Sequence, residues 1–175
     1  MATLQNTQPG NMNPLSASGF LFSIQKLPHV NYFLTGISLP EISLDQPQRA
    51  TPFGDQPLAG SKLTFGQLNI RFRIDENMQN YREIFRWMTA LGFPGGFEQT
   101  RSLARTSANP AGLTYSDATL IMTSSANNPN VKANFIDLYP ISLTTGEFSV
   151  DKTDVEPMEG TASFAYRSYD LLDVV

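Results

Sequence analysis

The 175-residue sequence contains no cysteine and a single histidine, His29. The absence of cysteine excludes disulfide bonds and thiolate metal sites, so folding depends on packing, and the chain suits a reducing cytoplasm without requiring one. A single histidine excludes paired-histidine metal sites and leaves few ways to activate a nucleophile. We expect His29, in the turn-like stretch PHVN, to be solvated and not catalytic.

Charged residues are also scarce. They make up 16% of the chain, against about 25% in typical globular proteins. The formal net charge is 12 − 16 = −4, and no stretch gathers lysine and arginine into a stripe that would neutralise a run of phosphates. The composition therefore argues against sequence-specific nucleic-acid binding and leaves neutral surface for protein contacts.

Long apolar runs are missing as well. No window approaches the roughly 20 apolar residues that span a bilayer, and the start of the chain lacks the basic and apolar regions of a secretory signal. We expect a soluble protein without a membrane anchor, made in the cytoplasm. Residues 1–17 are predicted to be a flexible N-terminal segment, and residues 18–175 a single β domain.

The motifs of common chemical sites are absent too. The stretches LAGSK and GFPGGF lack the spacing of a phosphate-binding loop, so turn or loop glycines are favoured. The carboxylates of Asp151, Asp154, Glu156 and Glu159 match no calcium loop, which favours a solvated acidic loop. We therefore expect no enzymatic activity, no metal and no cofactor.

Strand patterns dominate what is present. In GFLFSIQKL, Phe20, Phe22 and Ile24 share one face, and residues 32–39 are expected to form the hairpin partner of this strand. LNIRFRID alternates most cleanly, with the apolar set opposite Asn69, Arg71 and Arg73. Further strands are expected in SDATLIMTS, VKANFIDLYPISL, GEFSVD and TASFAYRSYDLL, which makes about seven or eight.

Between these strands, PEISLDQPQRATPFGDQPLAGSK has four prolines and little periodicity. It is predicted to be a long loop or arm, and loops of this length tend to be functional. Because neighbouring strands form hairpins, we expect a mainly β (α+β) fold, an antiparallel β-barrel or sandwich with one flanking α-helix.

That helix is predicted from a change of period. Met78, Tyr81, Ile84, Phe85, Met88 and Leu91 follow helical spacing and form the expected buried stripe. Asp75 or Asn77 is expected to cap its start, and Gly92 with Pro94 to end it.

Trp87 lies about 100° from the centre of this stripe, which makes it flanking or exposed. Arg82 and Arg86 lie further round the helix. Two interpretations stay open: Trp87 packs beneath a loop, or Trp87 and both arginines face another subunit, because Trp and Arg are enriched at interface hot spots. The second predicts that Trp87→Ala impairs assembly more than folding.

The strand NFIDLYPISL carries two residues that a central strand disfavours, Asp137 and Pro140. We expect Ile136 and Leu138 to pack inside the subunit, and Pro140 to bend the chain toward the next strand. Asp137 then marks a face open to solvent or to a neighbour.

Taken in order, these features resemble the tail tube proteins of contractile-tailed bacteriophages, a superfamily that includes the tube proteins of type VI secretion. The resemblance rests on FSIQKL, YFLTGISLPEISL, LAGSKLTFGQLNIRFRIDE, YREIFRWM and FIDLYPISLTTGEFSVDKTDVEPMEGTASFAYRSYDLL. The chain departs from the simplest tube pattern in its proline-rich segment, residues 46–57, and in its long loop, residues 93–114.

The resemblance implies a β-barrel-like subunit that forms homohexameric rings, which stack into a tube within the virion. Its implied partners are other copies of the chain, the tail sheath, the baseplate hub and the tape-measure protein. Genomic DNA would pass through the lumen without tight binding. The candidate subunit-interface residues are Phe53, Arg71, Arg73, Arg82, Arg86, Trp87 and Asp137.

Two alternatives stay open. A tube-end paralogue in the baseplate or neck would form a single ring. A monomeric β-sandwich binding module, of a different class, would use loop aromatics such as Phe53, Phe97 and Tyr115 as stacking surfaces.

Overall fold

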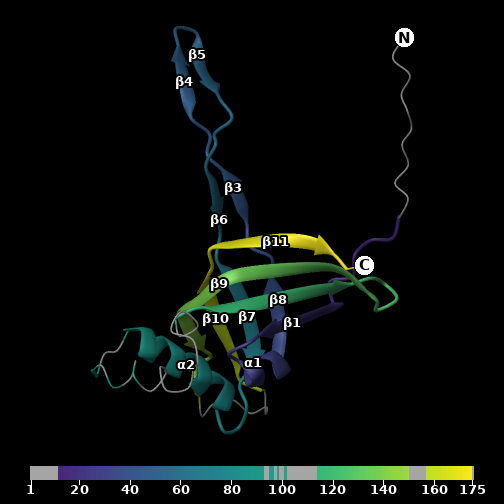
Figure 1. Ribbon diagram of the computed structural model, residues 1–175, viewed down its shortest axis with the longest axis vertical. Coiled ribbons are helices and arrows are strands. Elements are labelled where there is room, and N and C mark those ends of the chain that lie inside the picture. The colour runs from purple at the N-terminus through teal and green to yellow at the C-terminus, as the bar shows by residue number, and fades with distance from the viewer. Residues whose placement is uncertain are drawn as a thin grey trace.

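The computed structural model describes residues 12–92, 95–96, 98, 101, 114–149 and 157–174 (Figure 1). Most of the N-terminal segment and most of the loop at residues 93–114, with Phe97, lie outside the described residues. The same holds for Asp151, Asp154 and Glu156, so the expected acidic loop is not described.

The described residues form eleven strands and two helices, in the order shown in Figure 1. The strands are β1 (Phe20–Ile24), β2 (Leu34–Ser38), β3 (Ile42–Leu44), β4 (Gln48–Thr51), β5 (Gly54–Pro57), β6 (Leu63–Phe65), β7 (Leu68–Arg73), β8 (Ser116–Thr123), β9 (Pro129–Thr145), β10 (Glu159–Ala165) and β11 (Ser168–Asp173). The helices are α1 (Pro28–Tyr32) and α2 (Gln79–Gly92). The mainly β, antiparallel class with a flanking helix is confirmed.

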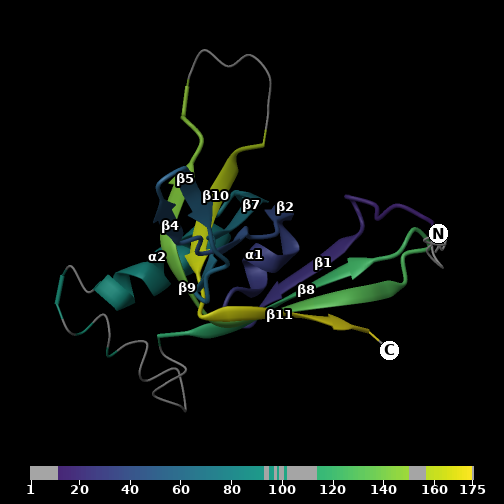
Figure 2. The same cartoon turned by 90° about the horizontal axis from the view of Figure 1, so that it is seen from above.

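Seven strands form the main sheet, in the order β1-β8-β9-β10-β7-β2, with β11 also paired to β9. The 17-residue strand β9 belongs to two layers. The first half of β9 pairs with β8 and β11, and these strands together with β1 form layer 1. The second half of β9 pairs with β10, and these strands together with β7 and β2 form layer 2. Figure 2 shows β9, β10, β7 and β2 side by side in this order.

One core lies between the two layers. Strand β7 alternates strictly, so Leu68, Ile70 and Phe72 are buried while the residues between them are exposed, as predicted. Phe22 and Ile24 from β1 join the same cluster from layer 1, with Phe164 from β10. Burial of these faces from water is the main force that holds the layers together.

The long strand β9 does not keep the predicted faces. Phe135 and Leu138 are both fully buried, whereas Ile136 is only half-buried. At this point one residue of β8, Asp117, faces two of β9, Ile136 and Asp137, and Asp137 takes a φ of 57°. A β-bulge therefore reverses the alternation. The prediction for Ile136 is therefore wrong. Pro140 is buried and pairs with Phe164, and the strand continues beyond it to Thr145.

Three further local predictions are wrong. Strand β1 pairs with β8 and not with β2, and residues 28–32, between β1 and β2, form the short helix α1, which starts with a proline. In GEFSVD, the described residues 146–149 are not in a strand. The closing stretch TASFAYRSYDLL forms two strands, β10 and β11, of which one returns to β9 in layer 1.

Residues 42–65, which include the proline-rich segment, form an arm as predicted, but the arm is built of two short ladders that the sequence analysis did not predict. Strands β3 and β6 pair next to the domain, and β4 and β5 pair beyond them. Figure 1 shows these four strands projecting away from the layers. Because β3 follows β2 and β6 precedes β7, the arm extends the β2–β7 hairpin along its strand direction.

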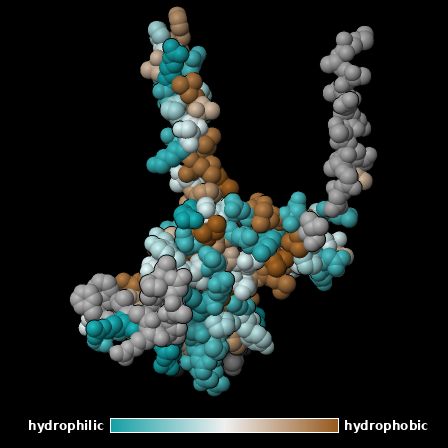
Figure 3. Space-filling view, viewed as in Figure 1, coloured by the Kyte–Doolittle hydropathy of each residue, from teal (hydrophilic) through white to brown (hydrophobic). Residues whose placement is uncertain are grey.

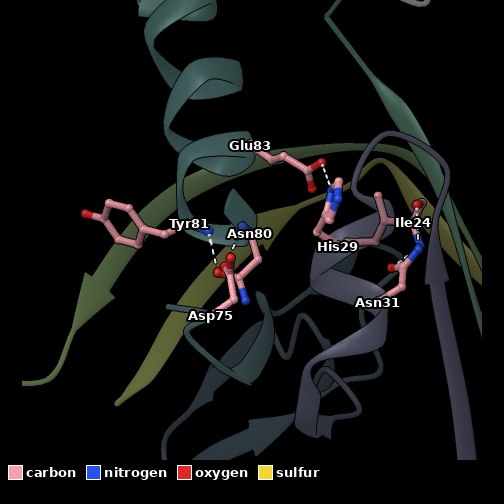
Figure 4. Close-up of polar contacts among 7 residues, drawn as sticks. All are labelled: Ile24, His29, Asn31, Asp75, Asn80, Tyr81 and Glu83. Atoms are coloured by element: carbon pink, nitrogen blue, oxygen red, sulfur yellow. Dashed lines mark hydrogen bonds and ion pairs between the residues drawn. The ribbon is translucent and has the colours of Figure 1, made fainter. Parts of the chain in front are cut away.

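Helix α2 starts where the sequence predicts and ends at the predicted Gly92, whereas Pro94 lies outside the described residues. The Asp75 carboxylate accepts the N–H of Asn80 at 3.1 Å (Figure 4). Slight burial raises the pKa of Asp75, but the backbone N–H groups of Asn80 and Gln79 stabilise its carboxylate, and the net pKa is lowered. Asn80 in turn donates to the Arg73 carbonyl at 2.6 Å, which ties the helix to the end of β7.

The buried face of α2 is rotated from the predicted stripe. Its buried residues are Asn80, Ile84, Trp87 and Ala90, whereas Phe85 is 54% exposed. The prediction that Trp87 flanks the buried stripe is wrong, since Trp87 lies within it. Glu83 on this helix contacts His29 of α1, so the expectation of a solvated histidine holds only in part (Figure 4).

Candidate assembly interface

The described residues hold no group of three or more His, Asp or Glu side chains placed to bind a metal. Among them, no helix combines the length and apolar character needed to cross a membrane. The features that call for a functional explanation are instead an exposed arm and the open edges of the main sheet.

The arm carries more apolar surface than one subunit covers. Phe53 at its tip is fully exposed (102%), and the aliphatic side chains below it are about half exposed. These are Ile42, Leu44, Leu58 and Leu63. Figure 3 shows the hydrophobic side chains gathered on the part of the arm nearest the domain. Exposed apolar surface of this kind is typical of an interaction site.

The base of the arm is anchored by aromatic packing. Phe65 of β6 contacts Tyr166 and Tyr169, with ring centroids 6.0 and 5.6 Å apart. Both tyrosines also contact the buried ring of Phe135. Burial, with a smaller contribution from Tyr169, raises the pKa of Tyr166 to about 12. The arm is therefore fixed to the core and leaves the domain in a set direction.

Layer 2 has an open edge on each side. Strand β2 ends the strand order, and the second half of β9 pairs only with β10 among the described strands. All neighbours in layer 2 are antiparallel, so β2 and β9, three positions apart, run in opposite directions. A groove of about 370 Å³ borders β2, lined by residues that include Phe20, Gly36 and Arg71.

Arg71 and Arg73 lie on the outward face of β7, and both are exposed. The Arg71 guanidinium lies over Gly36 of β2, where an added Cβ would come within 3.2 Å of its Nη2. Arg71 therefore reaches the open β2 edge. Arg73 lies opposite Glu159 of β10.

The candidates on α2 separate into two groups. Arg82 and Arg86 are exposed, next to the exposed Phe85, so this helix face is open to a neighbour. Trp87 is 3% exposed and packs against Phe164 at a centroid distance of 6.3 Å. Its Nε1–H donates to the Thr114 carbonyl at 3.3 Å. Of the two interpretations left open for Trp87, the structure supports packing within the subunit.

The architecture is that of known tube proteins. A chain in the structure of the anti-feeding prophage cap, which terminates the tube, matches with a TM-score of 0.65 at 14% identity, covering 99% of this chain and 100% of that one. The chain has the tube-protein fold. No protein-family model and no curated protein sequence matches it.

Two further tube-fold structures match. A chain in the six-fold symmetrised baseplate of the anti-feeding prophage gives a TM-score of 0.58 at 14% identity, with 91% of this chain and 96% of that one covered. A chain in the sheath–tube complex of PVC, an extracellular contractile injection system, gives a TM-score of 0.57 at 16% identity. The match covers 92% of this chain and 93% of that one. At such low identity the likeness extends to the fold alone.

Sequence reasoning named Tyr115 as a loop aromatic but missed the exposed patch that it forms with residues of β9. Tyr115 and Tyr139 form an edge-to-face pair at 5.8 Å, and Ile141 is exposed close by on β9. A second register shift of β9 against β10, between Phe164 and Ser163, leaves Ile141 as the extra residue. Bulges have no simple period, so strand alternation could not reveal this patch.

Asp137 has a role within the subunit that its sequence position did not predict. Its N–H donates to the Asp117 carboxylate at 3.2 Å, and its own carboxylate pairs with Arg167 at 3.1 Å. Asp137 is half-buried, and its positive φ forms the bulge. A contact of Asp137 with a neighbouring subunit remains a proposal.

We expect Asp137→Val to cost about 1–2 kcal/mol of unfolding free energy, because a β-branched side chain is strained in the left-handed region. Asp137→Gly is the matched control, since glycine adopts a positive φ without strain but also loses the ion pair. Urea unfolding of both variants measures the difference. Equal losses in the two variants would show that the ion pair, and not the backbone conformation, explains the effect.

Proposed function

We propose that this chain is the ring-forming structural subunit of a contractile tail tube or a related injection machine. The observation that carries the proposal is the pair of open, oppositely directed edges of layer 2 in a chain with the tube-protein fold. Free sheet edges attract pairing with another chain, and soluble proteins usually protect them. Assembly into a ring removes both edges at once.

Edge pairing closes a ring without breaking the sheet pattern. When β2 of one subunit pairs with the second half of β9 of the next, the two strands are antiparallel, like every other pair of layer 2. The contact joins two different surfaces, and repeated contacts of this kind close when the rotation allows. The expectation of six subunits rests on the tube resemblance, and the related baseplate is six-fold symmetrised.

The exposed arm and the exposed face of α2 supply contacts beyond the ring. We propose that Phe53 and the arm leucines contact further copies of the chain, and that Arg82 and Arg86 lie at a subunit contact. The sheath, the baseplate hub and a tape-measure protein are the proposed partners of the assembled tube. The related PVC chain comes from a sheath–tube complex.

We further propose that DNA passes through the lumen during delivery from a capsid to the host. The net charge of −4, without a basic stripe, suits a conduit that encloses nucleic acid without holding it. The assembled protein would then lie in the virion tail.

A tube-end ring is the second candidate. It is favoured by the match to the chain from the tube-terminating cap, which has a TM-score of 0.65 and covers both chains almost fully. Such a paralogue would close into one ring and would not polymerise.

Negative-stain microscopy and sedimentation of the purified chain test both candidates. Stacked rings or tubes support a main tube subunit, and discrete single rings at all concentrations support a tube-end subunit. Monomers at high concentration under every salt condition would contradict both, and would favour a monomeric binding module.

A further inference from the structure

The β4–β5 hairpin carries an aromatic ring and a carboxylate at its end. Phe53 is fully exposed, and Asp55 is exposed on the face of the hairpin that it shares with Ala50. The single base of this hairpin, Arg49, lies on the other face, across from Gln56. The ion pairs among the described residues all involve side chains other than Asp55. We call Phe53 and Asp55 the arm tip.

One side of α2 presents the complementary chemistry. Arg82, Phe85 and Arg86 have the spacing of neighbours on a helix surface, and all three are exposed. The two arginines are four residues apart, so they repel each other unless an acid neutralises them. Neither arginine takes part in an ion pair within the part of the chain that the structure describes. We call these three residues the helix face.

The arm and α2 lie at opposite ends of the domain (Figure 1). The arm precedes the start of β7, at Leu68, and α2 follows the other end of the same strand, at Arg73. When copies of the chain stack in one orientation, the arm end of one copy therefore meets the α2 end of the next. Residues 42–51 span about 30 Å at the usual rise of a strand, against about 20 Å for β7, so the arm tip extends well into the next copy.

We infer that the helix face is the docking site for the arm tip of a copy in the next ring. The Asp55 carboxylate accepts hydrogen bonds from the two guanidinium groups and removes the repulsion between them. The ring of Phe53 packs on the ring of Phe85, which covers two exposed aromatic side chains at once. The inference rests on the proposed function and adds to it the surface that receives the arm.

A contact of this kind separates stacking from ring closure. The arm tip and the helix face are different surfaces, so each ring offers one to the ring on one side and the other to the ring on the opposite side. Stacking then depends on side-chain charge and aromatic packing. Closure of the ring depends on backbone hydrogen bonds between β2 and β9, and a change of side chain on α2 leaves these intact.

Charge reversal with rescue tests the contact. Arg82→Glu combined with Arg86→Glu replaces both bases of the helix face by acids that repel Asp55. Because both side chains are exposed, this variant should keep the urea midpoint of the unmodified chain. Microscopy and sedimentation should show single rings without stacks. Adding Asp55→Arg should restore stacking, since opposite charges then face each other again.

Asp45→Arg is the matched control for the rescue. Asp45 is exposed on the same arm but nearer the domain, and its replacement changes the net charge by the same amount as Asp55→Arg. It should not restore stacking. Asp55→Arg alone should also lose stacking, so the test does not depend on the folding of the helix variant. Phe85→Ala should weaken stacking without any change of charge.

Three results would each overturn the inference. The first is stacking of the doubly reversed helix variant, or of Asp55→Arg alone, to the same extent as the unmodified chain. The second is a failure of Asp55→Arg to restore stacking to the reversed variant. The third is equal restoration by Asp45→Arg, which would show that net charge alone governs stacking.

Failure of the proposed function gives a different result. If the unmodified chain forms neither rings nor tubes, ring formation itself is contradicted, and the docking of the arm tip falls with it. If the unmodified chain forms single rings at every concentration, the ring remains, and only the contact between the arm tip and the helix face is overturned.

Discussion

Replacing Trp87 with alanine is expected to lower the unfolding free energy by about 3–5 kcal/mol, the usual cost of removing a buried aromatic side chain. The indole is almost completely buried against Phe164, and Lys26 Nζ lies 4.9 Å from the ring centroid. Because domains are stable by only about 5–15 kcal/mol, this loss would shift the urea midpoint strongly.

Two matched variants separate the causes of this loss. Trp87→Phe keeps much of the ring volume but removes the N–H that donates to the Thr114 carbonyl. We expect the lost hydrogen bond to lower the unfolding free energy by about 1 kcal/mol, in addition to any effect of changed packing. Phe85→Ala, on the exposed face of the same helix, should leave stability nearly unchanged. If Trp87→Ala instead unfolds like the unmodified chain but fails to assemble, the indole acts at a subunit contact and the packing interpretation is wrong.

Helix α2 shows what a sequence can and cannot predict. Its limits followed from Asp75 and Gly92, because capping and termination are local. Its buried face could not be predicted, because apolar residues occupy much of the helix circumference. Which of them become buried depends on the elements that pack against the helix. The inward position is held partly by Asn80, a polar residue bonded to the Arg73 carbonyl, and a hydrophobicity pattern gives no weight to such a bond.

The strands show the same limit. Strand β7 was predicted correctly since its alternation is uninterrupted from Leu68 to Phe72. The partner of β1 was not predicted correctly, because β8 lies almost 100 residues further along the chain and no local feature of β1 specifies this pairing. In β9, the bulge at Asp137 reverses the alternation, so Phe135 replaces Ile136 in the core.

The candidate interface was predictable in part. Phe53 stood out as an aromatic residue in a proline-rich arm, and the structure places it fully exposed at the arm's tip. Arg71 was identified from alternation alone, but its position over Gly36 at the sheet edge depends on the pairing of β2 with β7. Sequence patterns give the face of a strand, whereas its place in the sheet follows from distant partners.

Removing the tip of the arm is expected to abolish stacking of rings while leaving the subunit folded. The arm extends β2 and β7 along their own direction, so in a ring closed through layer 2 it leaves the plane of the ring toward the next one. The hairpin β4–β5 pairs only with itself among the described strands. Pro47 and Leu58 are hydrogen bonded at 2.9 Å, so an Asn-Gly turn can join them after deletion of residues 48–57.

The shortened chain should unfold in urea within about 0.5 kcal/mol of the full chain, since the removed residues touch no core group. Sedimentation and microscopy should show single rings in place of stacked ones, because edge pairing through β2 and β9 is untouched. Phe53→Asp should reproduce the loss of ring stacking. Gln56→Asp is the matched control, because it adds the same charge to the same hairpin without removing an aromatic ring. It should weaken ring stacking only slightly. If the shortened chain stacks as the full chain does, the arm has no part in joining rings. If it forms no rings at all, the arm acts within the ring, and the assignment of its direction is wrong.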